Sequence, residues 1–259
     1  MSETAAPTVA QAPLGGRPVR PPLPTWPLTV VETFDVTPRM KRIVFSGETL
    51  ADFVWTPAQD VVFRMTDETG EMVRRHYTVR LHDAAAKRME IDFVLHDHGL
   101  AADWARAAKP GDEVIVAGPR GNTTINKDAD WHLFTGDETC IPGVFAMVQS
   151  LPAGAKAFVF LEVQDAGEEQ PLDAEADVTL TWFHRNGPPT PGSPDLIAAF
   201  ADFVPPDGRG HAYVIGETST VQTQRRGLIA KGWDKSQISA EGYWRPGRLG
   251  GHDHVRDDH

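Results

Sequence analysis

The sequence predicts a β-barrel followed by an α/β domain. Residues before about 130 form short strand-like runs separated by turn residues, which is typical of an antiparallel barrel or sandwich. After that point strand-like and helical runs alternate, which predicts a parallel sheet with helices on both faces. The 259 residues are enough for two domains of ordinary size.

The barrel domain is predicted to span residues 26–128. It follows residues 1–25, which are rich in Pro, Ala and Gly and are expected to form a disordered tail. Its strands are predicted at residues 28–37, 41–47, 60–67, 74–82, 89–96 and 112–118. One helix is predicted over residues 99–111, where Gly99 precedes it and Pro110 and Gly111 end it.

The α/β domain is predicted to span residues 129–247 and to be followed by a flexible tail, residues 248–259. Its strands are predicted at residues 131–136, 155–163, 177–185, 211–216 and 236–244. Its helices are predicted at residues 140–151, 194–204 and 219–232.

Composition excludes several classes of protein. The net charge of −11 and the pI near 5.3 argue against binding to nucleic acid or to an anionic membrane. The single cysteine, Cys140, allows no intramolecular disulfide and no cysteine-ligated cluster. No apolar run reaches about 18 residues and the N-terminus does not resemble a secretory signal, so a cytoplasmic protein is expected. It is also expected to be a monomer.

The strand "MVRRHYTVRLH", residues 72–82, carries an unusual set of polar groups. Arg75 and Tyr77 are predicted to project to one side, and His76 and Thr78 to the other. An arginine binds phosphate bidentately and a tyrosine lies against a ring, so the strand suits a planar, phosphorylated ligand. The alternative is a solvated strand face with scattered arginines.

Three corners are candidate ligand sites. In "DFVLHDHGLAADWA" a strand ends and a helix begins near Leu100, where free amides bind phosphate, although an ordinary strand–turn–helix has the same pattern. "TGDETCIPG", residues 135–143, and "VIGETST", residues 214–220, follow strands of the predicted parallel sheet, whose carboxyl ends border ligand crevices. Neither has the GxGxxG fingerprint of dinucleotide-binding folds.

Five motifs together resemble the siderophore-interacting proteins, which are FAD-dependent ferric-siderophore reductases of the ferredoxin-reductase-like superfamily. The motifs are "RHYTVRLHD", "DFVLHDHGLAADWARAAKPGDEVIVAGPRG", "GDETCIPG", "TWFHRNG" and "GYWRPG", and the match runs in order from about residue 26 to 248. The resemblance implies a Greek-key FAD-binding barrel followed by an NAD(P)H-binding domain.

The resemblance also implies a set of site residues. The FAD contacts it implies are Arg75, His76, Tyr77, Thr78, Asp92, Phe93, Val94, His96, Gly99, Ala101, Ala102, Pro119, Gly121, Asp137, Glu138 and Thr139. Ala102 replaces a Ser or Thr of many relatives, so only its backbone amide can serve the phosphate. Cys140 replaces a common Ala; it is interpreted as a packing residue, although a helix start favours a reactive thiolate.

The implied reaction is reduction of a ferric siderophore with electrons from NAD(P)H, with no catalytic residue beyond the flavin. Arg185 is expected to meet a 2′-phosphate, which favours NADPH over NADH, and Gly216 and Glu217 complete the expected nucleotide site. A ferredoxin donor is an alternative. Lys41, Arg120 and Arg245 are the expected contacts to an anionic chelate.

Two other functions fit the same sequence: a flavin reductase serving a ferredoxin, flavodoxin or oxygenase partner, and a carrier that binds the chelate without reducing it. No metal site of the protein itself is predicted, because His96 and His98 fall in the implied FAD segment.

Overall fold

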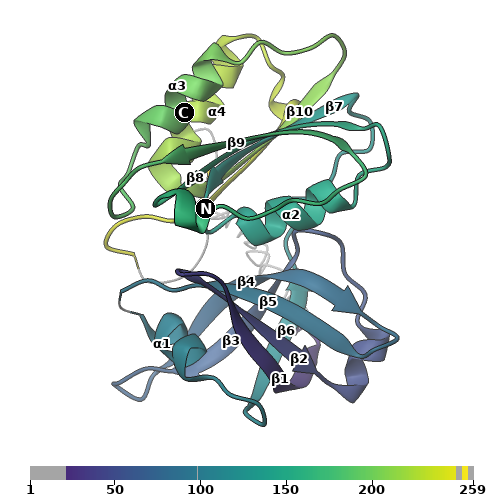
Figure 1. The fold of residues 1–259 in the computed structure, drawn as a ribbon, viewed down its shortest axis with the longest axis vertical. Coiled ribbons are helices and arrows are strands. Elements are labelled where there is room, and N and C mark those ends of the chain that lie inside the picture. Colours follow the sequence, from purple (N-terminus) through teal and green to yellow (C-terminus); the bar gives the residue numbers. More distant parts are fainter. Residues whose placement is uncertain (1–21, 98, 249–252, 256–259) are drawn as a thin grey trace, which may run out of the picture.

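Six antiparallel strands close the N-terminal barrel in the order β1–β2–β5–β4–β3–β6 (Figure 1). The computed structural model describes residues 22–97, 99–248 and 253–255. The barrel strands are β1 (Thr25–Thr37), β2 (Met40–Ser46), β3 (Asp60–Thr66), β4 (Met72–Asp83), β5 (Arg88–Val94) and β6 (Glu113–Arg120). A 3-10 helix, η1 (Glu48–Asp52), follows β2, and the helix α1 (Leu100–Ala107) connects β5 to β6.

Alternation along the strands fills the barrel. Side chains of every second residue, such as Ile43 and Phe45 on β2 and Ile91 and Phe93 on β5, point inward and are fully buried. Arg42 and Asp92 are partners in the same ladder and point outward, where they form a bidentate ion pair with bonds of 2.6 and 2.8 Å.

The second domain is a sheet of order β12–β11–β10–β7–β8–β9, parallel except for β12. Its strands are β7 (Trp131–Asp137), β8 (Lys156–Val163), β9 (Asp177–His184), β10 (Gly210–Glu217), β11 (Ile238–Trp244) and β12 (Asp253–His254). Its helices are α2 (Ile141–Gln149), α3 (Pro194–Asp202) and α4 (Thr218–Ala230), with 3-10 turns η2 (Ala166–Glu168) and η3 (Lys235–Gln237). The helix α2 covers the face toward the barrel, and α3 and α4 cover the other face (Figure 1).

This architecture confirms the predicted fold class, with one correction at the C-terminus. Residues 248–259 were expected to form a flexible tail, but Asp253–His254 pair antiparallel with β11 and Val255 packs on the hydrophobic cluster beneath α4. The backbone amides of an otherwise open sheet edge explain this attachment. Residues 1–21, most of the predicted disordered tail, lie outside the described residues.

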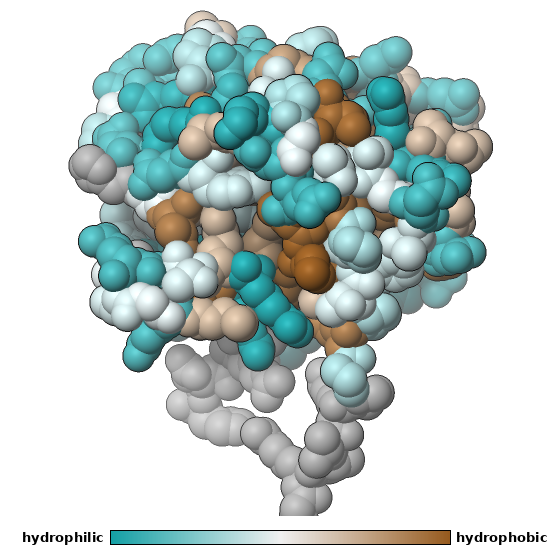
Figure 2. All heavy atoms as spheres, turned by 90° about the horizontal axis from the view of Figure 1, so that it is seen from below, coloured by the Kyte–Doolittle hydropathy of each residue, from teal (hydrophilic) through white to brown (hydrophobic). Residues whose placement is uncertain are grey.

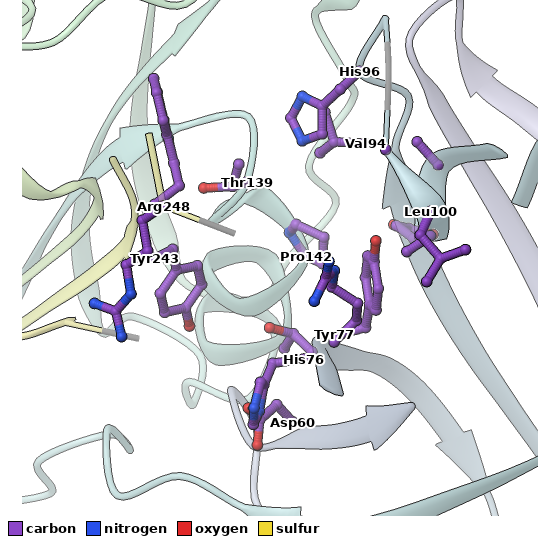
Figure 3. Close-up of a pocket in the computed structure, with 17 residues that line it drawn as sticks. Asp60, His76, Tyr77, Val94, His96, Leu100, Thr139, Pro142, Tyr243 and Arg248 are labelled. Atoms are coloured by element: carbon purple, nitrogen blue, oxygen red, sulfur yellow. The ribbon is translucent and has the colours of Figure 1, made fainter. Parts of the chain in front are cut away.

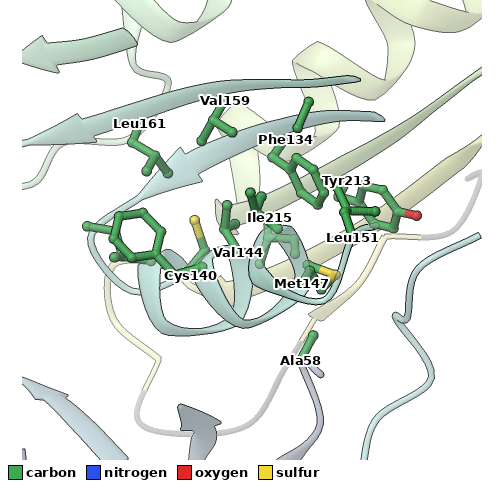
Figure 4. Close-up of a cluster of buried hydrophobic side chains, with 14 of the residues drawn as sticks. Ala58, Phe134, Cys140, Val144, Met147, Leu151, Val159, Leu161, Tyr213 and Ile215 are labelled. Carbon is green, nitrogen blue, oxygen red and sulfur yellow. The ribbon is translucent and has the colours of Figure 1, made fainter. Parts of the chain in front are cut away.

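The helix α2 joins the two domains through one hydrophobic cluster. Val144 and Met147 of α2 are fully buried against the sheet residues Phe134 and Tyr213 (Figure 4). Met40 and Ala58 of the barrel belong to the same cluster. The barrel and the sheet are therefore held in contact by shared apolar burial.

The face at the barrel end of the molecule is mostly polar. Seen from the barrel end it is hydrophilic around a small apolar area (Figure 2). A cavity of about 670 Å³ opens on the barrel and is lined by Phe63, Met65, Leu100, Trp104, Val114 and Ile115 among others. No helix in the described part of the chain has the length and apolar character needed to span a bilayer.

Candidate functional site

A cavity of about 260 Å³ lies where the barrel meets the α/β domain. Tyr77 and Leu100 lie on one side of it, Tyr243 and Arg248 lie on the other, and Pro142 lies between them (Figure 3). The full lining is Asp60, Arg75, His76, Tyr77, Thr78, Asp92, Val94, His96, Gly99, Leu100, Ala101, Ala102, Thr139, Pro142, Tyr243, Trp244 and Arg248. Most of the implied FAD contacts are thus brought together around one space.

The strand β4 supplies a ring and a cation to this cavity. The Tyr77 ring packs on Phe93 with centroids 4.2 Å apart, which fixes its orientation. Burial raises the pKa of the Tyr77 phenol, so it remains protonated and neutral. The Arg75 guanidinium donates to the carbonyl of Arg74 at 3.0 Å, and no carboxylate of the described residues forms an ion pair with it.

The first turn of α1 supplies backbone donors. Gly99 precedes the helix with φ of 152° and gives no side-chain cap. The first amides of a helix have no carbonyl partner within it, so those of Leu100, Ala101 and Ala102 are available to an anion. The small Ala101 and Ala102 side chains are buried against the barrel and leave this turn open.

These two features fit FAD. An arginine without a carboxylate partner among the described residues and a helix start without a side-chain cap from Gly99 suit the pyrophosphate, and the tyrosine beside them suits a planar ring. The Arg75 guanidinium and the first amides of α1 can both donate hydrogen bonds to a bound anion. The cavity therefore has the donors that the pyrophosphate of FAD requires.

Sequence reasoning missed several lining residues, namely Asp60, Leu100, Pro142, Tyr243, Trp244 and Arg248. The Tyr243 hydroxyl contacts Thr78, and burial raises the pKa of this phenol well above its ordinary value. Arg248 follows a turn in which its amide donates to the Arg245 carbonyl at 3.3 Å and Gly247 has a φ of 77°. The Pro-Gly pair in "RPGR" was a signal for this turn.

A small ionic group lies at the edge of the cavity. His76 Nδ1 is 2.9 Å from a carboxylate oxygen of Asp60. Arg120 Nη1 lies 3.3 and 3.4 Å from the two nitrogens of the same imidazole, and Arg120 Nε lies 3.5 Å from Asp60. The expected chelate contact Arg120 is thereby linked to the cavity wall through His76.

Five of the implied FAD contacts do not line the cavity. Phe93 supports Tyr77 from inside the barrel, and Pro119 and Gly121 lie at the end of β6, where Gln59 donates to the Gly121 carbonyl at 3.2 Å. Asp137 and Glu138 are bound to other protein groups on the sheet side.

Asp137 joins the carboxyl ends of three strands. Its carboxylate accepts from the Glu217 amide at 2.8 Å, from the Trp244 indole at 2.8 Å and from the Thr139 amide at 2.9 Å. Gly216 is required beside it, because a Cβ there would lie 2.6 Å from the Asp137 carboxylate. The Asp137 carboxylate therefore ties together the ends of β7, β10 and β11 beside the cavity. Burial raises the pKa of this carboxyl group.

The expected nucleotide residues are already paired. Arg185 donates two bonds to Glu138, at 2.7 and 2.6 Å, and its side chain is 8% exposed. Glu217 caps α4 by accepting from the amides of Ser219 and Thr220 at 3.0 and 2.8 Å. In this structure the Arg185 guanidinium is already bound to protein groups at the edge where a 2′-phosphate was expected.

The remaining expectations also have places in the fold. Lys41 forms an ion pair with Asp35 at 2.7 Å on β1 and β2 and does not line the cavity, and Arg245 is exposed on the turn after β11. Cys140 is 1% exposed, and burial raises the pKa of its thiol well above the ordinary value, as the packing interpretation predicts. His98 lies outside the described residues.

Comparisons with known proteins agree with this geometry. The model of the siderophore-interacting protein family matches residues 129–247, and that of the siderophore-interacting FAD-binding domain matches residues 56–123. The ferric vibriobactin reductase ViuB of Vibrio cholerae is 32% identical over 184 residues, covering 68% of this chain and 66% of the relative. The NADPH-dependent ferric-chelate reductase of Escherichia coli is 26% identical over 239 residues, covering 84% of this chain and 91% of the relative.

A solved structure described as a siderophore utilization protein from T. fusca has the same fold. It aligns with a TM-score of 0.81 and 36% identity, over 88% of this chain and 95% of that one. The alignment spans both domains, so the arrangement of barrel and sheet is shared as well as each domain.

Proposed function

Because this chain belongs to the siderophore-interacting protein family, we propose that it is an FAD-dependent oxidoreductase that reduces ferric siderophores with electrons from NAD(P)H. One observation supports this most strongly. The cavity between the domains gathers Arg75, Tyr77, Thr78 and the uncapped start of α1 around one space.

In this proposal the barrel side holds the cofactor. Arg75 and the α1 amides would hold the pyrophosphate, Tyr77 would pack on the ring, and Thr78 would offer its hydroxyl to it. The bound flavin supplies the exchange between a two-electron donor and a one-electron acceptor. The protein groups would orient the ring, and Pro142 of α2 and Tyr243, which line the cavity, would help to exclude water from it.

The substrate is an Fe(III) chelate whose hard oxygen ligands hold Fe(II) less tightly, so reduction releases the metal. Ferric chelates of catecholates are anionic, and the net charge of −11 opposes their approach. We propose that Arg120, Arg245 and Arg248 form the local cationic surface that offsets this charge. Lys41 is a weaker candidate, because it is paired with Asp35 away from the cavity.

The direct test uses the purified holoprotein. A flavin absorbance spectrum is expected, followed by bleaching of that spectrum when NADPH or NADH is added without oxygen. Ferric catecholate, hydroxamate and carboxylate chelates are then mixed with the reduced protein, and Fe(II) is measured with a ferrous indicator. A colourless protein that does not take up added FAD, or a reduced protein that no ferric chelate reoxidises, contradicts the proposal.

We also propose that the protein acts as a monomer in the cytoplasm, where NAD(P)H is supplied. Size-exclusion chromatography with light scattering and fractionation of cells test these two points. A dimer at micromolar concentration or recovery of the protein outside the cytoplasmic fraction contradicts them.

A further inference from the structure

Arg185 follows β9 at the carboxyl edge of the parallel sheet, which is where sheets of this kind bind nucleotides. Every nitrogen of its guanidinium has a protein partner. Nη1 and Nη2 donate to the two oxygens of Glu138 at 2.7 and 2.6 Å, and Nε donates to the Gly187 carbonyl at 3.0 Å. A second carboxylate, that of Glu162, lies 3.9 Å from Nη1.

The surrounding edge is acidic and its helix starts are occupied. Glu217 caps α4, and Ser193 caps α3 while its hydroxyl donates to Glu162. Asp137 lies at the same edge and is 6% exposed. Asp137, Glu162 and Glu217 line a small cavity at this edge. Among the described residues that line it, Arg185 is the only arginine.

Freeing Arg185 for a phosphate has a cost. The side chains of Arg185 and Glu138 are 8% and 15% exposed, so breaking their pair leaves a nearly buried carboxylate without its cation. That carboxylate would then lie beside Asp137 and an incoming dianionic phosphate. The repulsion removes most of what the new arginine–phosphate contact contributes.

We propose that Glu138 determines the nucleotide preference of this chain: it holds Arg185 in a bidentate pair, so the 2′-phosphate of NADPH adds little to binding. NADPH and NADH then bind with similar affinity, and Glu138 is a specificity-determining residue rather than a flavin contact. This inference rests on the proposed NAD(P)H-dependent function.

The variant Glu138→Gln tests the inference in the FAD-loaded protein. The amide keeps the size of the side chain but cannot form a charged bidentate pair, so Arg185 gains freedom to bind phosphate. Apparent dissociation constants are measured from anaerobic flavin reduction by each nucleotide. We expect NADPH binding to tighten about tenfold, the worth of one charge-assisted hydrogen bond, with NADH unchanged.

Glu169→Gln is the matched control. Glu169 pairs at 2.8 Å with His184, the last residue of β9, and forms no hydrogen bond or ion pair with Arg185, yet its replacement changes the net charge by the same amount. An equal tightening of NADPH binding in both variants shows general electrostatics and overturns the role of Glu138. The gain in Glu138→Gln is expected to disappear when Arg185→Met is added, and its persistence also overturns the inference.

A binding measurement on the unmodified holoprotein covers the case in which Glu138→Gln does not fold. Adenosine 2′,5′-bisphosphate and adenosine 5′-monophosphate differ only in the 2′-phosphate, and calorimetry is expected to give affinities within about threefold of each other. A tenfold preference for the bisphosphate overturns the inference. Failure of both nicotinamide nucleotides to reduce the flavin instead contradicts the proposed function, because the adenosine comparison involves no electron transfer.

Discussion

The barrel side of the cavity and the carboxyl edge of the sheet border the same region, but their polar groups differ in how far they are already paired. On the barrel side, Arg75 has no carboxylate partner among the described residues, and the first turn of α1 has no side-chain cap. On the sheet side, Arg185 and Glu217 are bound to other protein groups. A donor such as Arg75, which has no carboxylate partner among the described residues, is ready for a permanent anionic cofactor, whereas a donor already bound to a carboxylate suits a reactant that must also leave.

The largest effect is expected on the barrel side of the cavity, where replacing Arg75 should weaken FAD binding. We expect Arg75→Ala to remove the proposed bidentate contact to the FAD phosphate, worth about 4 kcal/mol, and so to lower FAD affinity roughly 1,000-fold. Fluorescence titration of apoprotein with FAD measures the change. Arg74→Ala is the matched control, because Arg74 is exposed, adjacent and absent from the cavity lining. Equal losses in the two variants would contradict the assignment.

The second prediction concerns the amino end of the parallel sheet, where hydrogen bonds to Asn126 and Ser239 depend on a neutral His211. His211 is 5% exposed and lies 3.0 Å from both Asn126 and Ser239. Burial, with help from His132 and Arg209, lowers its pKa from 6.5 to about 4. The folded state therefore resists protonation, and stability present above pH 6.5 is lost as the pH falls toward 4.

That loss amounts to about 3 kcal/mol when complete, since each pKa unit corresponds to about 1.4 kcal/mol. Urea unfolding between pH 7 and 4 measures it. His211→Gln is expected to flatten this dependence, and His184→Gln, at the half-buried end of β9, is the control. An unchanged slope in His211→Gln rules out His211 as its source.

A smaller effect is expected on the exposed turn after β11. Arg245→Ala removes one exposed cation, worth about 1 kcal/mol to an anionic chelate, so the rate constant for chelate reduction at low concentration is expected to fall about fivefold. The FAD content should stay the same. Loss of FAD would instead place Arg245 at the cofactor.

The smallest effect is expected at Cys140. Its thiol is buried and its raised pKa keeps it protonated, so a thiol reagent should react only after denaturation. Cys140→Ala should leave FAD content and turnover within about twofold. Rapid labelling of the native protein would show a reactive thiol and contradict the packing interpretation.

The residues on the barrel side of the cavity could be found from the sequence because their signals are local. Arg75, Tyr77 and Thr78 are neighbours in one strand, and Gly99 stands directly before a helix. Residue type and spacing alone left a solvated strand face and an ordinary strand–turn–helix open, and the resemblance to the siderophore-interacting proteins selected the ligand site. Asp60 and Tyr243 reach the same cavity only through barrel closure and the order of the sheet, which no short segment encodes.

The sheet side shows the limit more clearly. Glu138 and Arg185 were both selected, the first for the flavin and the second for a phosphate, yet 47 positions separate them and they bind each other. Composition and spacing indicate what kind of group a side chain can bind. They do not reveal which residue of the same protein binds it in the folded structure. Buried ion pairs between distant strands are therefore the part of such a site that needs coordinates.

The apolar cluster that α2 shares with Met40 and Ala58 has a consequence for how the molecule melts. Neither half can lose its interior without uncovering part of the other, so heating is expected to produce a single cooperative transition. An isolated barrel fragment would expose the apolar surface that α2 normally covers, and it would contain only one side of the cavity.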